Sequence, residues 1–190
     1  MSETKNILLV GVGGQVTILA SKILSEGLVN AGYDVKMSEI HGMSQRGGSV
    51  STQIRYGDKV FSPIIGRGQA DVIVAFEKIE ALRWLDHLKP GGKIVINDHE
   101  IPSVPILMGA ARYPQGIIEE LAAKANVQVF KAAELAAELG NSRAMNIILL
   151  GALVNAMQLG ELDWETMIRN NVKKGFEELN IAAFRKGFEL

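Results

Sequence analysis

The chain has 190 residues, of which 47% are hydrophobic and 22% charged, and its formal net charge is -1. This composition is typical of a globular protein, and it excludes both a largely disordered chain and one that binds nucleic acid through bulk positive charge. The absence of cysteine excludes disulfides, thiolate nucleophiles, and iron–sulfur or zinc sites held by cysteine.

The first 40 residues predict a βαβ unit. Residues 5–10 form a short apolar run that ends at glycine, which is typical of a buried strand. Residues 15–31 carry apolar side chains at helical spacing, and Gly32 is a common residue at the end of a helix. Residues 34–40 predict a second strand. Because such units are right-handed crossovers between parallel strands, we expect a parallel sheet.

The middle of the chain predicts a hairpin, followed by strands that alternate with helices. Residues 49–56 alternate in polarity, and a turn at Gly57 leads to an expected partner strand at residues 59–61. Further strands are expected at residues 71–76, 93–97 and 127–130, and helices at residues 77–88, 115–125 and 131–139. Pro90 and the two glycines after it predict a turn between a helix and a strand.

After Gly140 the pattern becomes helical, with three helices expected at residues 142–159, 164–174 and 176–188. The sequence therefore predicts an α/β fold: a Rossmann-like, mostly parallel sheet with helices on both faces, an added hairpin and an α-helical C-terminal cap. We expect a single domain over residues 1–190, with the sheet core in residues 1–140 and the cap in residues 141–190.

No segment of the sequence predicts a membrane span or a secretion signal. The longest apolar run on a predicted helix, residues 147–157, is shorter than the ~20 residues that a bilayer requires. Residues 1–5 are polar and lack a signal-peptide pattern. We therefore expect a cytoplasmic protein without a membrane partner.

A glycine-rich loop, GVGGQV at residues 11–16, follows the first predicted strand and opens the first predicted helix. Glycines allow a tight turn there, and the helix N-terminus offers unpaired N–H groups to a phosphate or carboxylate. Val16 stands where a dinucleotide fingerprint has its third small residue, and Glu39 stands where the ribose-binding acid is expected. Two interpretations are open: a nucleotide site, or a sharp turn with Glu39 in solvent or in an ion pair.

A second loop, within EIHGMSQRGGSV at residues 39–50, lies just past the carboxyl end of a predicted strand, where open α/β sheets place ligand sites. Its glycines allow backbone N–H groups to form an anion-binding nest. Arg46 is suited to grip a carboxylate or phosphate, and His41 to transfer a proton. The alternative is that these polar groups satisfy one another within the loop or meet another subunit.

Together, GVGGQ and EIHGMSQRGGSV resemble the γ-type subunit of 2-oxoacid:ferredoxin oxidoreductases, and within that family the β subunit of indolepyruvate oxidoreductase. The length, the order of elements and the apolar helix that begins near Asn146 also fit, so the resemblance covers nearly the whole chain. The residues that match the family's two loops are Gly11, Gly13, Gly14 and Gln15 in the first, and His41, Gln45, Arg46, Gly47 and Gly48 in the second. Val16 departs from the glycine that is usual in the family.

The resemblance implies an enzyme that oxidatively decarboxylates a 2-oxoacid such as indolepyruvate, passes electrons to ferredoxin and releases an acyl-coenzyme A. It implies that thiamine diphosphate, Mg²⁺ and iron–sulfur clusters are bound by a larger, cysteine-rich partner chain. The second loop would then lie at the subunit interface near coenzyme A, with His41 and Arg46 supporting catalysis. We expect the chain by itself to bind no metal and to be inactive.

Two other functions stay open: a self-sufficient nucleotide-dependent oxidoreductase or methyltransferase, and a non-catalytic binding module. Residues 97–100, with the sequence NDHE, contain metal-ligand types after a predicted strand. Neighbouring side chains in an extended chain point to opposite sides, however, so this stretch does not favour a metal site.

Overall fold

The computed structural model describes residues 3–13, 17–41 and 47–190. The strands are β1 (Lys5–Val12), β2 (Asp34–His41), β3 (Ser49–Gly57), β4 (Ala70–Ala75), β5 (Leu88–Asn97) and β6 (Asn126–Phe130). The α-helices are α1 (Thr17–Asn30), α2 (Lys78–Arg83), α3 (Val104–Leu107), α4 (Ile117–Ala122), α5 (Ala132–Glu138), α6 (Met145–Ala156), α7 (Trp164–Asn171) and α8 (Glu177–Phe188). Short 3₁₀ turns lie at Leu85–His87 and Ser142–Ala144.

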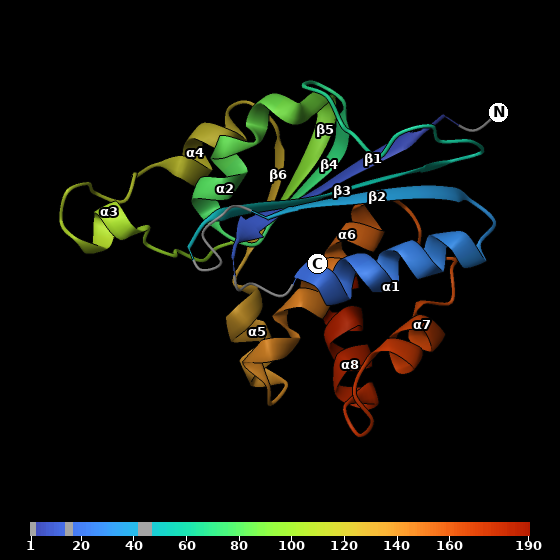
Figure 1. Cartoon of the computed structure of the whole chain (residues 1–190). Helices are drawn as coiled ribbons and strands as arrows, with labels where there is room; N and C mark the ends of the chain where they lie inside the picture. Colours follow the sequence, from blue (N-terminus) through green and yellow to red (C-terminus); the bar gives the residue numbers. More distant parts are fainter. Residues whose placement is uncertain (1–2, 14–16, 42–46) are drawn as a thin grey trace.

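The strands form one mixed sheet in the order β2-β3-β1-β4-β5-β6. Strands β1, β4, β5 and β6 are parallel, whereas β3 runs antiparallel to both of its neighbours, β1 and β2. Strand β2 therefore runs in the same direction as β1. Figure 1 shows the sheet between two groups of helices, with α2 and α4 on one face and α1 and α5–α8 on the other. The predicted fold class is confirmed.

Alternating side chains of the strands build a separate core on each face of the sheet. Ile7 and Leu9 of β1 point into the larger core, which they share with α1, α6 and α8. Leu8 and Val10 point into the smaller core, which is closed by α2 and α4. This alternation follows from the two-residue period of a strand, and apolar side chains on both faces mark β1 as a central strand.

The C-terminal helices pack on the sheet through α6, whose apolar side chains belong to the larger core. Helix α8 crosses α6 at very short range: a Cβ placed on Gly151 would lie 2.1 Å from the carbonyl oxygen of Phe184. A Cβ on Gly187 would likewise lie 1.9 Å from the carbonyl oxygen of Ile148. The two glycines therefore set the distance between the helices.

No helix in the described part of the chain is both long and apolar enough to cross a bilayer.

Two predictions about the middle of the chain are wrong. Residues 59–61 form no strand; β3 pairs with β2 and β1 instead, and Asp34 binds this segment by accepting a 2.8 Å hydrogen bond from the N–H of Val60. The turn expected at Pro90 lies inside β5, which starts at Leu88 and contains an irregularity in its pairing with β4. The left-handed backbone of Gly91, with φ of +77°, accommodates the irregularity.

Residues 101–116 form a segment that projects from the sheet and carries the short helix α3 (Figure 1). Its apolar side chains are unusually exposed, with Leu107 at 72% and Met108 at 78%. Arg112 is the only charged residue in this stretch, although 22% of the chain is charged. A segment that is both exposed and nearly uncharged is typical of a surface that meets another protein.

Candidate functional site

The carboxyl ends of the parallel strands meet at one edge of the sheet. Strand β1 ends at Val12, β4 at Ala75, β5 at Asn97 and β6 at Phe130, and β2 ends beside them at His41. In open α/β sheets this edge carries the ligand site, because the loops that follow the strands are gathered there.

The two glycine motifs come together at this edge. The N–H of Gly13 donates a 2.8 Å hydrogen bond to the carbonyl oxygen of Gly48. In the sheet, Gly11 of β1 and His41 of β2 both lie opposite Val50 of β3, one on each side. The predicted site residues Gly11, Gly13, His41, Gly47 and Gly48 are thus neighbours, and the others, Gly14, Gln15, Gln45 and Arg46, lie outside the described residues together with Val16.

Glu39 is held by contacts within the protein. Its Oε1 accepts a 3.2 Å hydrogen bond from the hydroxyl of Ser21 on α1, and its Oε2 lies 3.7 Å from Nε2 of His41. Because β3 separates β2 from β1, Glu39 lies two strand spacings, about 10 Å, from the strand that carries the first glycine loop. This placement favours the structural interpretation of Glu39 over a ribose-binding one.

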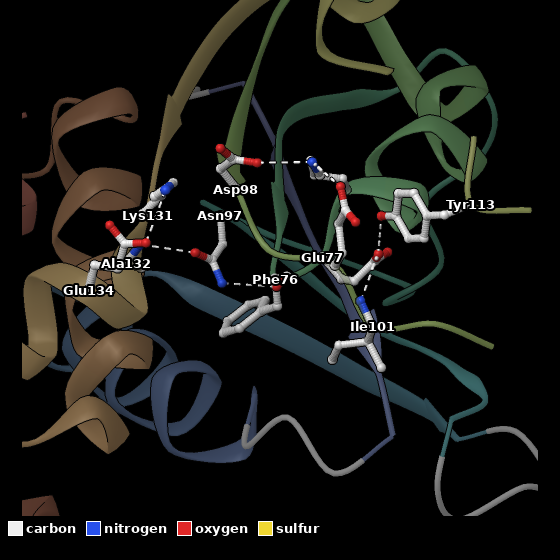
Figure 2. Close-up of polar contacts among 11 residues, drawn as sticks. Phe76, Glu77, Asn97, Asp98, Ile101, Tyr113, Lys131, Ala132 and Glu134 are labelled. Atoms are coloured by element: carbon white, nitrogen blue, oxygen red, sulfur yellow. Dashed lines mark hydrogen bonds and ion pairs between the residues drawn. The ribbon is translucent and has the colours of Figure 1, made fainter. Parts of the chain in front are cut away.

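A buried carboxylate that the sequence interpretation missed, Glu77, follows β4 at the same edge. Its Oε2 accepts a 3.0 Å hydrogen bond from the N–H of Glu80 and thereby caps α2. Its Oε1 accepts from the N–H of Ile101, at 3.3 Å, and from the hydroxyl of Tyr113. Figure 2 shows Glu77 between these two residues, which belong to the two ends of the projecting segment. Burial and this hydrogen bond to Glu77 raise the pKa of Tyr113.

Asn97, which the sequence analysis singled out only as part of the NDHE stretch, joins three elements at the end of β5. Its Nδ2 donates to the carbonyl oxygen of Phe76 at 3.1 Å, and its Oδ1 accepts from the N–H of Ala132 at 2.9 Å. The side chain is completely buried, and Figure 2 shows it between β4 and the start of α5. A buried amide with both ends satisfied fixes the spacing of these elements, since a shift of either would leave a polar group unpaired.

Lys78 occupies the space next to these residues and forms ion pairs with Asp98 at 3.1 Å and Glu100 at 2.7 Å. Burial alone would lower its pKa, but hydrogen bonds to Glu100 and Asp98 raise it overall. The carboxylates of Asp98 and Glu100 are therefore both paired with the ammonium group of Lys78. Among the residues that the structure describes, no group of three or more His, Cys, Asp or Glu is arranged to hold a metal ion.

The missed residues had a weak signal in the sequence. Glu77 directly follows a predicted buried strand and Glu80 comes three residues later, so their place near the carboxyl edge could have been inferred. Their burial could not, because a carboxylate in the first turn of a helix is ordinarily exposed.

The chain is similar to known proteins over nearly its whole length. A model of the pyruvate ferredoxin/flavodoxin oxidoreductase family matches residues 6–190. The indolepyruvate oxidoreductase subunit IorB of Thermococcus kodakarensis is 39% identical over 189 residues, which cover 96% of this chain and 93% of that protein. A solved γ subunit of a keto/oxoacid ferredoxin oxidoreductase from Geobacter sulfurreducens is 25% identical, with a TM-score of 0.71 and coverage of 97% and 96%.

The same fold also occurs inside a longer polypeptide. The structure of 2-oxoglutarate:ferredoxin oxidoreductase from Magnetococcus marinus, which contains 2-oxoglutarate, coenzyme A and succinyl-CoA, matches with a TM-score of 0.73 at 20% identity. The match covers 100% of this chain but 31% of the other one. At this identity the likeness concerns the fold alone.

Proposed function

Because the chain belongs to the pyruvate ferredoxin/flavodoxin oxidoreductase family, we propose that it acts in the oxidative decarboxylation of an indolepyruvate-like 2-oxoacid to an acyl-coenzyme A. It is a subunit of a 2-oxoacid ferredoxin oxidoreductase and part of a multi-subunit complex. Thiamine diphosphate, Mg²⁺ and iron–sulfur clusters belong to a larger, cysteine-rich partner chain in this proposal. When bound there, these groups supply the carbon–carbon cleavage and the electron transfer.

The observation that carries the proposal is the meeting of the two glycine loops at the carboxyl edge of the sheet. The hydrogen bond from Gly13 to Gly48 makes one continuous backbone surface of two sequence motifs. Gly47 adds a left-handed residue with φ of +78°, a conformation that occurs in anion-binding turns of the backbone. The phosphates of coenzyme A are anions of the kind that such a surface binds.

His41 and Arg46 have supporting roles in this proposal. His41 ends β2 beside the glycine loops, and its largely exposed imidazole lies near one carboxylate, Glu39. Arg46 lies outside the described residues, and its predicted role is to bind a phosphate or carboxylate. In this proposal neither residue takes part in the carbon–carbon cleavage itself, which the cofactor of the partner chain would supply.

The division of labour agrees with the composition and the surface of the chain. Without cysteine it cannot hold a cysteine-ligated cluster, so electrons must travel through another chain. Val104 and Leu107 on α3 and Met108 directly after it are between 60% and 78% exposed, which suits a subunit with a protein neighbour. Glu77 anchors this segment beside the glycine loops, so a partner that covers it also reaches the candidate site.

Reconstitution of the pair tests the proposal. The chain and its cysteine-rich partner are purified separately and together, and reduction of a ferredoxin-like acceptor is measured with indolepyruvate and coenzyme A. Turnover that requires both chains is expected. Binding of a nucleotide by the isolated chain, without complex formation, would instead favour the self-sufficient oxidoreductase or methyltransferase. If the chain showed neither turnover nor a partner, the non-catalytic binding module would be the remaining interpretation.

A pair of arginine variants examines the second loop in the same assay. Arg46→Ala is expected to lower turnover, or to raise the KM for coenzyme A by about ten- to a hundredfold, since a lost charged hydrogen bond costs roughly 1.5–3 kcal/mol. Arg143→Ala, in the exposed turn before α6, is the matched control and should leave both constants unchanged. Equal constants for the two variants would remove Arg46 from the site.

A further inference from the structure

The start of β3 is held by a buried carboxylate that the function described above does not use. Ser49 is the first residue of β3 and lies opposite Val12 in the ladder with β1. Its hydroxyl donates a hydrogen bond to Oε2 of Glu80 on α2, and it accepts a 3.5 Å hydrogen bond from the indole N–H of Trp84. Ser49 is therefore fixed from the helical face of the sheet as well as through the strand ladder.

Glu80 is a residue whose burial at this position costs free energy. Only 5% of its side chain is exposed, and its Oε1 is satisfied by the guanidinium of Arg83 at 3.0 Å. Burying a carboxylate costs free energy that hydrogen bonds only partly restore, and an apolar side chain of similar volume would serve packing better. A carboxylate here makes two contacts that an apolar side chain could not make, one to Ser49 and one to Arg83, and only the contact to Ser49 reaches the strand next to the glycine loops.

That contact leads directly to the glycine loops. Ser49 follows Gly48, whose carbonyl oxygen accepts the hydrogen bond from Gly13. A change in the position of Ser49 would therefore move Gly48 and loosen its hydrogen bond with Gly13. The path from the carboxylate of Glu80 to the backbone of Gly13 consists of two hydrogen bonds and one peptide unit.

We propose that Glu80 is a positioning residue that acts through Ser49 to hold the backbone of Gly48 against that of Gly13, in the arrangement that binds the phosphate-bearing cosubstrate, coenzyme A. This inference rests on the proposed function. It assigns no contact between Glu80 and the ligand, because the carboxylate points to Ser49 and Arg83.

Three single variants and one double variant of the reconstituted complex test the role of Glu80. Glu80→Leu and Ser49→Ala each remove the contact and are expected to raise the KM for coenzyme A about tenfold, with the KM for indolepyruvate within about twofold of the wild type; tenfold corresponds to about 1.4 kcal/mol. Glu80→Gln keeps an oxygen acceptor for Ser49 and should restore the coenzyme A value. The double variant should be no worse than either single one, since both remove the same contact.

Asn180→Ala provides the control for a general loss of stability. Asn180 is buried in α8, where it hydrogen-bonds to the carbonyl of Phe176, remote from the glycine loops. It should lower the unfolding midpoint while leaving the KM for coenzyme A unchanged. Ser49→Ala keeps the inference testable if Glu80→Leu does not fold, because it removes only one oxygen atom.

The outcomes separate this inference from the proposed function. An active wild-type complex in which Glu80→Leu or Ser49→Ala leaves the KM for coenzyme A unchanged overturns the positioning role alone. A fall in the apparent kcat in proportion to lost folded protein, with both KM values unchanged, assigns Glu80 to stability and overturns it too. A wild-type complex without coenzyme A-dependent turnover overturns the proposed function, and the positioning role with it.

Discussion

The N–H of Gly13 and the carbonyl oxygen of Gly48 are joined by a 2.8 Å hydrogen bond, so two glycine motifs that are far apart in the sequence share one backbone surface. A hydrogen bond between loops is sensitive to the backbone on either side of it. Gly47, the residue before Gly48, is where this sensitivity can be measured, because its left-handed backbone conformation is disfavoured for residues that carry a side chain.

Gly47→Ala is expected to weaken the site without a steric clash. Gly47 has φ of +78°, and no atom of the described residues lies within 4 Å of a Cβ placed there, so the cost is conformational and amounts to about 1–2 kcal/mol. Gly175→Ala is a matched control, since Gly175 has φ of +92° and equally open surroundings between α7 and α8. Urea unfolding should show similar losses for both, and only Gly47→Ala should raise the KM for coenzyme A; identical kinetics would contradict a role of this loop in binding.

Asn97→Asp is expected to introduce a pH-dependent loss of stability. The new carboxylate would be buried and would face the carbonyl oxygen of Phe76, to which Nδ2 of Asn97 now donates at 3.1 Å. Its folded-state pKa would rise above the unfolded value of about 3.9, so the loss is complete above the folded pKa and disappears as the pH falls below about 4. At pH 7 we expect a loss of about 3–5 kcal/mol in urea unfolding.

Asn97→Leu separates burial of charge from loss of the hydrogen bonds. It leaves the N–H of Ala132 and the carbonyl of Phe76 without this partner, and it should cost a similar amount at pH 4.5 and pH 7.5. If the stability of Asn97→Asp were equally insensitive to pH, the side chain at this position would be in contact with water. That result would contradict the complete burial of Asn97.

The strands could be predicted from the sequence because their signal is local. Residues 7–10 are apolar on both faces, and β1 accordingly separates two cores. The partner of β3 could not be predicted in this way, since a hairpin to residues 59–61 satisfies the same local pattern. Insertion of β3 between β1 and β2 depends on contacts of high sequence separation, such as Lys5 opposite Tyr56, which periodicity does not contain.

The candidate site was predictable to a similar extent. The glycine loops stand out because their composition is unusual, and the strand ends locate them at one edge of the sheet. Glu77, Glu80 and Asn97 look like ordinary polar residues of a helix turn and a strand end. Their importance comes from burial and from partners such as Tyr113 and Ala132, which only the tertiary structure brings near.

Gly187→Ala tests the crossing of α6 and α8. A Cβ at this position would lie 1.9 Å from the carbonyl oxygen of Ile148, and both atoms belong to helix backbones that cannot rotate away. Separation of the helices would cost about 3 kcal/mol, at the upper end of overpacking effects. Lys186→Ala, on the neighbouring residue, should stay within about 0.5 kcal/mol of the wild type. A similar unfolding midpoint for the two variants would mean that the helices do not cross this closely.

Tyr56→Phe tests the alkaline limit of stability. Burial, with smaller contributions from Tyr33 and Asp71, raises the pKa of Tyr56 above its ordinary value. The folded state therefore keeps this phenol neutral, whereas the unfolded chain ionises it from about pH 10. The stabilisation is complete below about pH 10 and is lost as the pH rises toward the folded pKa. The free energy of unfolding should thus fall less steeply between pH 9 and about pH 11 in Tyr56→Phe than in the wild type. Lysine deprotonation affects both proteins equally and cancels in this comparison, so parallel slopes in urea unfolding would show that the phenol of Tyr56 reaches water in the folded protein.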